Sequence, residues 1–574
     1  MESLQTKGEN FKNTIFGAIF LLAITIAVIS IWCGRNFDLR YPIALLGGDE
    51  TSYMSEVKMM LETHNWYKSN NIGAPYGTDR TMSISYYLFN DVHYISFFWV
   101  IMTKNVGISV NLTFFTLIFL NALFAFLFFR YRKLEVMISL LGAISFAFQP
   151  YVLMRNIGHI MLAAVYTIPI CFFLCFEIAE NDNYLKKWTA RTMCHLICMF
   201  LIINSGIGYY TFFSCFFIIV TGIIISFEKR DMIYFWKSIK SVGIMAIMLI
   251  LILVRLVISF IQSGGGLVQT PRSFGDVEIY SLKIARLFIP PYGTPFERIN
   301  NIISEYNAIA VCEGDATEYL GLIGVVGFIL LLITFLRGKD AENNDLKLAS
   351  KWSIMAILYS TIGGFCVFVF LFVTQMARCT NRISIYIGFL SIFCVLIFLK
   401  QWKVQVKYKK TARDFVILFV FVLGMHSQLK VMPILDNTEA KNIAIELEIL
   451  CDEIENISGE GCMIYQAPFQ SYPDGAFLNT AYPNAEFMPY LYSEKIRWSY
   501  GAMRGESSWD TNANIWNAGM IKKDLQEVGY GGVLVDTAAF SQDDLPTFLN
   551  KCREDFGEEV LTSMSGRWKY FSIE

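Results

Sequence analysis

Apolar runs close to twenty residues long recur along this chain, and they limit what it can fold into more than any other feature does. They lie at 14–33, 109–129, 135–149, 160–177, 192–204, 210–227, 238–262, 319–336, 352–374, 384–399 and 413–427. A helix of about twenty apolar residues spans the hydrocarbon core of a bilayer. Only 17% of the 574 residues are charged, whereas soluble domains carry about a quarter. The sequence therefore predicts an α-helical polytopic membrane protein with about eleven transmembrane helices.

Composition and motifs argue against several other classes of protein. The net charge of −2 provides no general attraction to nucleic acid, so we expect no nucleic-acid partner. The thirteen cysteines lie mostly in apolar runs and form no CxxC pair, which is typical of small core residues and not of a zinc site. The sequence contains no Walker motif, GxSxG, HExxH or Rossmann fingerprint. The first apolar run, from Ile15 to Cys33, lacks a small-residue cleavage site, so we interpret it as a retained membrane anchor.

The connections between the apolar runs alternate in charge. Five of them are rich in Lys and Arg, and they lie at 130–133, 185–191, 228–240, 337–351 and 400–413. Basic connections of membrane proteins stay in the cytoplasm. The pattern therefore predicts a multi-pass protein of the cell membrane with a cytoplasmic N-terminus. Long segments at 34–108 and 263–318, and the tail after residue 429, are expected outside.

The tail is more polar than the rest and mixes two periodicities. Helical patterns lie at 439–456 and 543–557, and strand-like patterns lie at 461–469, 531–540 and 567–574. We interpret residues 430–574 as an extracytoplasmic α/β domain that follows a transmembrane domain of residues 1–429.

Asp49 and Glu50 stand side by side in "GGDE", just beyond the first apolar run. A carboxylate shielded by neighbouring helices has a raised pKa and serves as a general base. The alternative is a helix N-terminus or a solvated loop, because "DETSYMSEVKMMLE" has the pattern of a helix start. Adjacent residues of a helix point about 100° apart, so one carboxylate can face a groove while the other caps or pairs.

Several cations are predicted near the same side of the membrane. Two pairs are spaced four residues apart, as on one helical face, and two more arginines lie within or after the span at 238–262. These residues are Arg155 with His159, Arg378 with Arg382, Arg255, and Arg286. Together they suit an anion held at that depth, and a lipid phosphate is the obvious one. The alternatives for each are snorkelling to headgroups and local ion pairs with Asp276, Glu278 or Glu318.

Metal ligands are few. His93 and His159 could join Asp49 and Glu50 around a divalent ion, but they are far apart in the sequence. No metal site is assigned, and no cofactor is identified beyond a possible divalent ion.

Six stretches, taken in order, resemble a known group. They are "GDETSYMSEVKMMLETHNWYKSNNIGAPYGTD", "SFAFQPYVLMRNIGHIMLAAVYTIPI", "YSLKIARLFIPPYGTPF", "EYLGLIGVVGF", "NRISIYIGF" and "IRWSYGAMRG". With an acidic residue in the first outer loop and an outside C-terminal domain, they resemble the GT-C superfamily of membrane glycosyltransferases. The nearer resemblance is to uncharacterised bacterial YfhO-like proteins. The segment "RTMSISYYLFND" and the absence of a His after Pro290-Pro291 depart from that group's pattern.

The resemblance implies a catalytic carboxylate at Asp49, with Glu50 in support. It implies transfer of a sugar from a polyprenyl-phosphate-linked donor to a cell-surface glycan or lipid-linked acceptor, with inversion. The cations above would bind the donor phosphate. The first-loop surface around Trp66, Tyr67, Gly73, Ala74 and Pro75 and the polar pair Glu318 and Asn381 would contact substrate. Two other functions stay open: transport or flipping of a lipid-linked saccharide, and a non-catalytic role in cell-envelope assembly.

Overall fold

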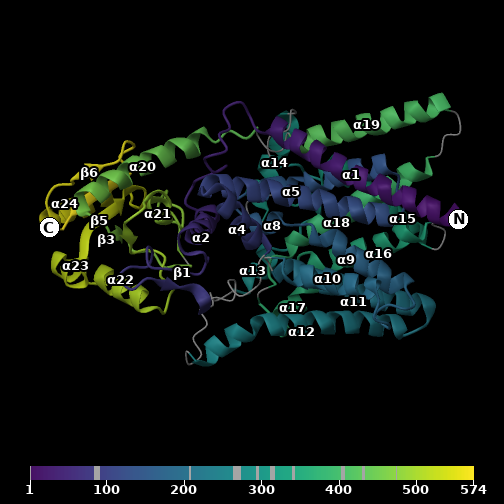
Figure 1. Ribbon diagram of the computed structural model, residues 1–574, viewed down its shortest axis with the longest axis horizontal. Helices are drawn as coiled ribbons and strands as arrows, with labels where there is room; N and C mark the ends of the chain where they lie inside the picture. The colour runs from purple at the N-terminus through teal and green to yellow at the C-terminus, as the bar shows by residue number, and fades with distance from the viewer. Residues whose placement is uncertain are drawn as a thin grey trace.

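The protein is described by a computed structural model, which covers residues 2–82, 91–205, 208–262, 273–291, 297–310, 317–338, 343–375, 377–402, 407–429, 434–473 and 475–573. A long helical bundle occupies one part of the molecule, and a smaller mixed α/β unit lies beyond one end of it (Figure 1). The N-terminus lies at the opposite end of the bundle from that unit.

The bundle is built from the apolar runs. Its helices are α1 (Glu2–Trp32), α5 (Val106–Tyr131), α6 (Val136–Ala147), α7 (Pro150–Arg155), α9 (Thr167–Glu180), α10 (Ala190–Ile203), α11 (Gly208–Lys229), α12 (Ile233–Gln262), α15 (Gly321–Arg337), α16 (Asn344–Ser360), α17 (Cys366–Phe372), α18 (Ser384–Gln401) and α19 (Lys407–Leu429). Within the described residues, seven helical segments are long and apolar enough to cross a membrane, and α10 and α15 are shorter apolar helices. The chain is therefore a helical membrane protein, although the structure does not establish the predicted eleven spans.

Two of the predicted spans are interrupted. The run at 160–177 is divided between α8 (Ile160–Ala163) and α9, and Pro169 lies in the first turn of α9, where its missing N–H is tolerated. The run at 352–374 is divided between α16 and α17. Gly363 lies at that break with φ +67°, a conformation that glycine adopts without strain. Hydrophobicity alone could not locate either interruption.

Short elements gather at the end of the bundle that faces the α/β unit. They are α2 (Asp49–Thr63), β1 (Lys68–Ser69), β2 (Thr78–Asp79), η1 (Arg80–Met82), α4 (Asp91–Thr103), α13 (Gly275–Ile279), η2 (Ile284–Leu287), α14 (Glu297–Ile309) and η4 (Thr380–Ile383). Among them, α2 packs against α4, α5 and the α/β unit and thus lies between the bundle and that unit.

Residues 434–573, here called the C-terminal unit, contain a five-stranded mixed sheet. Its strands are β3 (Met463–Ala467), β4 (Arg497–Trp498), β5 (Tyr530–Asp536), β6 (Leu561–Thr562) and β7 (Trp568–Ser572), in the order β4-β3-β5-β7-β6. Its helices are α20 (Thr438–Ser458), α21 (Phe487–Tyr492), α22 (Ser507–Asn517), α23 (Lys522–Val528) and α24 (Asp544–Phe556), with the short η5 (Thr537–Ala539). The two helices and three strands expected from periodicity all occur at their predicted places.

The central strand β5 shows why this sheet has helices on both faces. Its side chains alternate between faces. Leu534 packs into the large core that continues into the bundle, whereas Val533 and Val535 pack into a second core with Leu525 and Leu549.

The first outer loop attaches to the C-terminal unit through its backbone. The Trp498 N–H donates to the Asn71 carbonyl (2.9 Å), and the Gly73 and Ala74 N–H groups donate to the carbonyls of Tyr500 and Trp498 (both 2.9 Å). The loop thus pairs along the β4 edge of the sheet, which satisfies backbone groups that an open edge would leave exposed.

The five basic connections meet at the other end of the bundle. Ion pairs and hydrogen bonds join them: Arg132 with Glu180 and Asp345, Lys351 with Glu228, Arg413 with Glu135, and the Lys240 ammonium with the Leu185 carbonyl. The structure therefore gathers the connections that the charge pattern assigned to one side. That this side is cytoplasmic stays a prediction.

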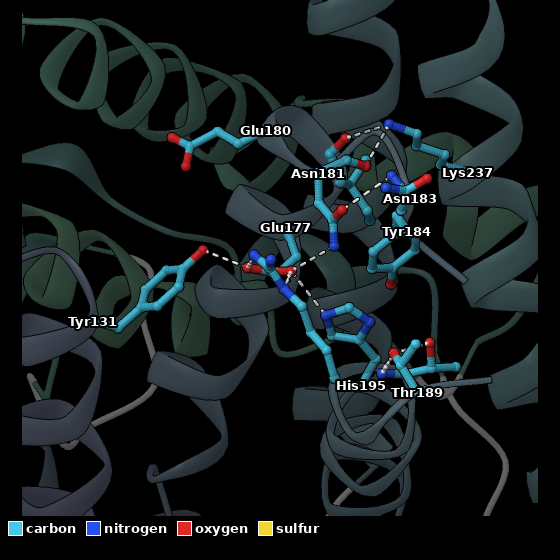
Figure 2. A network of polar contacts seen from close by, with 12 residues as sticks. Tyr131, Glu177, Glu180, Asn181, Asn183, Tyr184, Thr189, His195 and Lys237 are labelled. Atoms are coloured by element: carbon cyan, nitrogen blue, oxygen red, sulfur yellow. Dashed lines mark hydrogen bonds and ion pairs between the residues drawn. The ribbon is translucent and has the colours of Figure 1, made fainter. Parts of the chain in front are cut away.

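Glu177 is the centre of a buried network at this end (Figure 2). Its carboxylate accepts hydrogen bonds from Tyr131 Oη (2.7 Å), Asn181 Nδ2 (3.1 Å) and Arg191 Nε (2.8 Å), and lies 2.9 Å from His195 Nε2. The Glu177 side chain is 1% exposed. A buried carboxylate is stable only with several such partners. Here the partners come from α5, α9 and α10 and fix these helix ends together.

Candidate active site

A cavity of about 480 Å³ opens at the end of the bundle that carries the C-terminal unit. Its walls come from α2, from the turn and short helix at 157–162, and from the stretch that leads into α18. The lining residues are Asp49, Ser52, Tyr53, Glu56, Ile157, Gly158, His159, Ile160, Met161, Leu162, Arg378 and Arg382. The cavity therefore combines carboxylates, a histidine and two arginines.

One face of α2 forms the acidic wall. Asp49, Ser52, Tyr53 and Glu56 are spaced at i, i+3, i+4 and i+7, which places them on one side of a helix. The helix begins at Asp49 because Gly47 and Gly48 turn the chain just before it. Gly47 has φ +92°, which favours glycine.

Asp49 points into the cavity. Its side chain is 69% exposed, and its Oδ2 lies 3.5 Å from Nε2 of His159. Although the carboxylate opens into the cavity, the surrounding walls displace bulk water, and this desolvation raises the pKa of Asp49 above its ordinary value. The negative charge of Glu50 raises the pKa further, and the positive charge of Arg382 opposes the shift. A carboxylate whose pKa is raised is a stronger base than an ordinary aspartate, which suits a general base.

Glu50 has a different environment from its neighbour. It is 5% exposed, and its Oε1 accepts hydrogen bonds from the N–H groups of Leu46 (2.8 Å) and Gly48 (3.1 Å) and from Thr51 Oγ1 (3.1 Å). These hydrogen bonds to the Glu50 carboxylate stabilise the turn formed by Gly47 and Gly48. Its position allows a supporting role through the geometry of Asp49.

The two arginines of the cavity differ in their partners. Arg378 Nη1 lies 2.5 Å from Oδ2 of Asp276, and its guanidinium stands over the ring of Tyr280. This is one of the local ion pairs considered as an alternative. The Arg382 guanidinium lies 4.5 Å from the ring centroid of Tyr209. Its positive charge lowers the pKa of the Asp49 carboxyl. Of the two, Arg382 is electrostatically coupled to the acidic wall.

The predicted helical pairs are wrong in detail. Arg155 ends α7, and the chain then turns at Asn156 with φ 32°, so Arg155 and His159 do not share a helical face. Arg155 is buried and donates to Thr317 Oγ1 (3.1 Å), whereas His159 faces the cavity. Arg378 likewise precedes the short helix η4 that contains Arg382. Local turns override the four-residue spacing in both cases.

The other predicted donor-phosphate and substrate residues are not among the residues that line the cavity. Asn381 Nδ2 donates to Glu318 Oε1 (3.2 Å), and both side chains are buried. Arg286 is buried and donates to Asn307 Oδ1 (2.9 Å). Trp66 stacks on His93 with 5.3 Å between ring centroids and meets Tyr67 edge-on. Arg255 belongs to α12, but its side chain lies outside the described residues.

A second charged cluster continues from the cavity wall toward the C-terminal unit. Glu56 Oε2 lies 2.7 Å from Nε2 of His93, and Glu56 Oε1 lies 3.9 Å from Nη1 of Arg80. The fully buried Arg80 guanidinium stands over the rings of Tyr472 and Phe487 in the C-terminal unit. Sequence analysis missed Glu56 and Arg80, although the helical period from Asp49 pointed to Glu56.

The residues around Asp49 do not form a metal centre in this structure. Across the residues that the structure describes, no three His, Cys, Asp or Glu side chains come together in a group suited to a metal ion. Asp49 and His159 supply two donors, which is fewer than the three or four protein ligands of a zinc site.

The fold is similar to that of solved membrane proteins. The structure of ArnT from Cupriavidus metallidurans bound to undecaprenyl phosphate superposes with a TM-score of 0.53 at 10% identity, covering 97% of this chain and 98% of that one. The apo form of the same protein gives a TM-score of 0.51 at 12% identity over the same shares. The arabinofuranosyltransferase AftD from Mycobacteria (mutant R1389S) gives 0.50 at 10% identity, covering 97% of this chain and 41% of that one. The chain is thus a polytopic helical membrane protein whose fold is similar to those of ArnT and AftD.

A sequence family matches part of the chain. Residues 109–363 match the family described as Domain of unknown function (DUF6311). No curated protein matches the sequence.

Proposed function

We propose that the chain is a GT-C-type membrane glycosyltransferase that moves a sugar from a polyprenyl-phosphate-linked donor to an acceptor hydroxyl. The observation that carries this proposal is the cavity itself, in which Asp49 stands beside His159 and is coupled to Arg382. The support from the fold is that ArnT, solved with undecaprenyl phosphate bound, has the same overall architecture.

The charges of the cavity suit an inverting displacement. The acceptor oxygen attacks the anomeric carbon as the bond from that carbon to the phosphate oxygen breaks, and the phosphate leaves with the electron pair. Asp49 takes the proton of the acceptor hydroxyl. Arg382 stabilises the negative charge that grows on the departing phosphate, and in a cavity with little bulk water this stabilisation exceeds its value in solution.

Glu50 and Glu56 have supporting roles in this proposal. Glu50 fixes the turn that aims Asp49, and Glu56 is balanced by His93 and Arg80. Arg378, already paired with Asp276, contributes to the positive wall with a weaker net charge. The buried Arg155 and Arg286, and the Glu318–Asn381 pair, shape the surrounding helices in this account.

The proposal also places the active site on the outer face of the membrane. The helix α2, which lines the cavity, lies at the end of the bundle opposite the basic connections (Figure 1), so the positive-inside rule assigns the cavity and residues 430–574 to the outside. An acceptor there is a cell-surface glycan or a lipid-linked glycan. The nearer relationship to YfhO-like proteins stays a prediction.

The experiment compares cells that carry the wild-type chain with cells that carry Asp49→Asn. Membranes receive polyprenyl-phosphate donors with a radiolabelled sugar, and label in surface glycans is counted. We expect incorporation by the wild type and its loss in the variant. Equal incorporation by both would remove Asp49 from the chemistry and favour transport or assembly functions.

A further inference from the structure

An exposed aromatic pair on the C-terminal unit lies directly beside the turn that carries Asp49. The rings of Phe477 and Tyr482 have their centroids 5.0 Å apart, and they are 67% and 38% exposed. A Cβ atom built on Gly48 would lie 3.7 Å from Cδ1 of Tyr482, so this ring lies next to the turn immediately before Asp49. Large apolar rings left exposed together mark interaction sites.

The segment that carries the pair is held firmly. Leu478 and Ala481 form a tight turn through two backbone hydrogen bonds (3.1 and 2.8 Å). Asn479 Nδ2 donates to the Phe540 carbonyl (2.7 Å), and the Thr480 N–H donates to the Ala538 carbonyl (3.1 Å). The two rings therefore stand on a preorganised support, which lowers the entropy cost of binding a ligand.

The segment is also tied to the glycine turn. The Asn484 N–H donates to the Gly47 carbonyl (2.7 Å), and Asn484 Nδ2 donates to the Gly48 carbonyl (3.3 Å). Ala485 packs so close to Gly47 that its Cα would lie 2.8 Å from a Cβ built there. The position of the aromatic pair relative to Asp49 is thus fixed by direct contacts.

We propose that Phe477 and Tyr482 form the binding platform for the acceptor carbohydrate, an inference that rests on the proposed function of Asp49. Aromatic faces pack against the apolar C–H faces of sugar rings, while the Tyr482 hydroxyl can bond to sugar hydroxyls. A sugar stacked on this platform lies next to the turn that ends in Asp49.

The test separates acceptor binding from catalysis. The full chain in detergent, as wild type, Phe477→Ser, Tyr482→Ser and the double variant, is applied to an array of hexose, pentose and amino-sugar oligosaccharides. We expect about 2- to 10-fold weaker binding for each ring lost. Phe477→Tyr and Tyr482→Phe keep the rings and should bind within about twofold of the wild type. Tyr76→Ser, which removes an equally exposed ring (68%) from the first outer loop, is the matched control.

Three outcomes would overturn the proposal. Unchanged array binding in the double variant overturns it, and so does an equal loss in Tyr76→Ser. The third outcome comes from the fluorescence of a Phe477→Trp variant that is reconstituted in lipid nanodiscs. Quenching of its fluorescence by brominated lipid would show the ring inserted in the membrane and would also overturn the proposal. The two proposals can also fail separately. If array binding depends on the pair but the protein shows no transfer activity, the platform is kept and the transferase function is rejected.

Discussion

Arg378 and Arg382 are only four residues apart and line the same cavity, yet their surroundings differ. The charge of Arg378 is balanced by Asp276 at 2.5 Å, whereas Arg382 acts on the carboxyl of Asp49. An arginine that already has a carboxylate partner attracts a phosphate less, because the pair is nearly neutral at a distance.

We therefore expect unequal effects when the two are removed. Arg382→Gln should weaken use of the polyprenyl-phosphate donor by about 1.5–3 kcal/mol in kcat/KM, the usual value of a hydrogen bond to a charged group. Arg378→Gln should have a smaller effect. Lys347→Gln, in a basic connection at the far end of the bundle, is the control. Equal rates in all three variants would show that neither arginine meets the phosphate.

Single residues of the site were predictable where local pattern decided the outcome. Asp49 stood out because of the glycine turn, and Glu56 was within reach because it follows Asp49 by two helical turns. The contact between Asn484 and Gly48 joins residues 436 positions apart, and no local pattern encodes it. The burial of Arg155 also escaped prediction, because the chain leaves the helix at Asn156.

At the scale of elements, the start of α2 depends on the C-terminal unit. Asn484 bonds to both glycines of the turn, and Ser52 Oγ lies 3.1 Å from Tyr472 Oη. The start of α2, which carries Asp49, is thus positioned by a segment from the other part of the molecule. The side chain of Asn484 is a positioning residue in this arrangement, because it acts on Asp49 through the turn.

Asn484→Asp tests this arrangement with little change in shape. The variant loses the Nδ2 donor to the Gly48 carbonyl, so Asp49 should be aimed less well. We expect kcat to fall about 10-fold with donor KM nearly unchanged, since orientation contributes mainly to the chemical step. Asn550→Asp, at an exposed position of α24 whose Oδ1 only accepts a hydrogen bond, serves as the comparison. A fall in thermal stability without a selective fall in kcat would reduce Asn484 to a structural role.

The network around Glu177 has a structural role in this account, unlike the charges of the cavity. It joins helix ends at the end of the bundle that carries the basic connections (Figure 2). Glu177→Gln should lower the free energy of unfolding by about 1–3 kcal/mol, the cost of leaving buried donors poorly paired. Glu180→Gln is the control, since its side chain is 51% exposed and its pair with Arg132 should be worth less than about 1 kcal/mol. Thermal unfolding in detergent, followed with turnover per folded molecule, checks both. A large loss of turnover at unchanged stability would contradict a structural role.

At the scale of the whole molecule, the basic connections lie at one end of the bundle and the candidate active site lies at the other. Hydrophobic runs and the alternation of basic connections predicted this polarity from the sequence. They could not predict the breaks in 160–177 and 352–374, which depend on tertiary packing. They also gave no sign that the first outer loop pairs with the edge strand β4.

The polarity of the bundle leads to a prediction about the membrane. A reporter that is active only outside the cytoplasm should be active when fused after Glu574 and inactive when inserted in 185–191. The reverse pattern would place the cavity on the cytoplasmic face, where the proposed surface acceptors are absent.

The central claim is that Asp49 is the general base of a sugar transfer in this cavity. The most direct measurement is turnover of a polyprenyl-phosphate-linked sugar by the purified full chain in lipid vesicles, with Asp49→Asn compared with Asp38→Asn. Asp38 lies in the loop before α2, its side chain is 19% exposed and pairs with Arg40, and it controls for loss of charge near the same segment. The account predicts a fall of about 10²–10⁴-fold for Asp49→Asn with donor binding retained, and normal turnover for Asp38→Asn. Near-normal turnover in Asp49→Asn would contradict it.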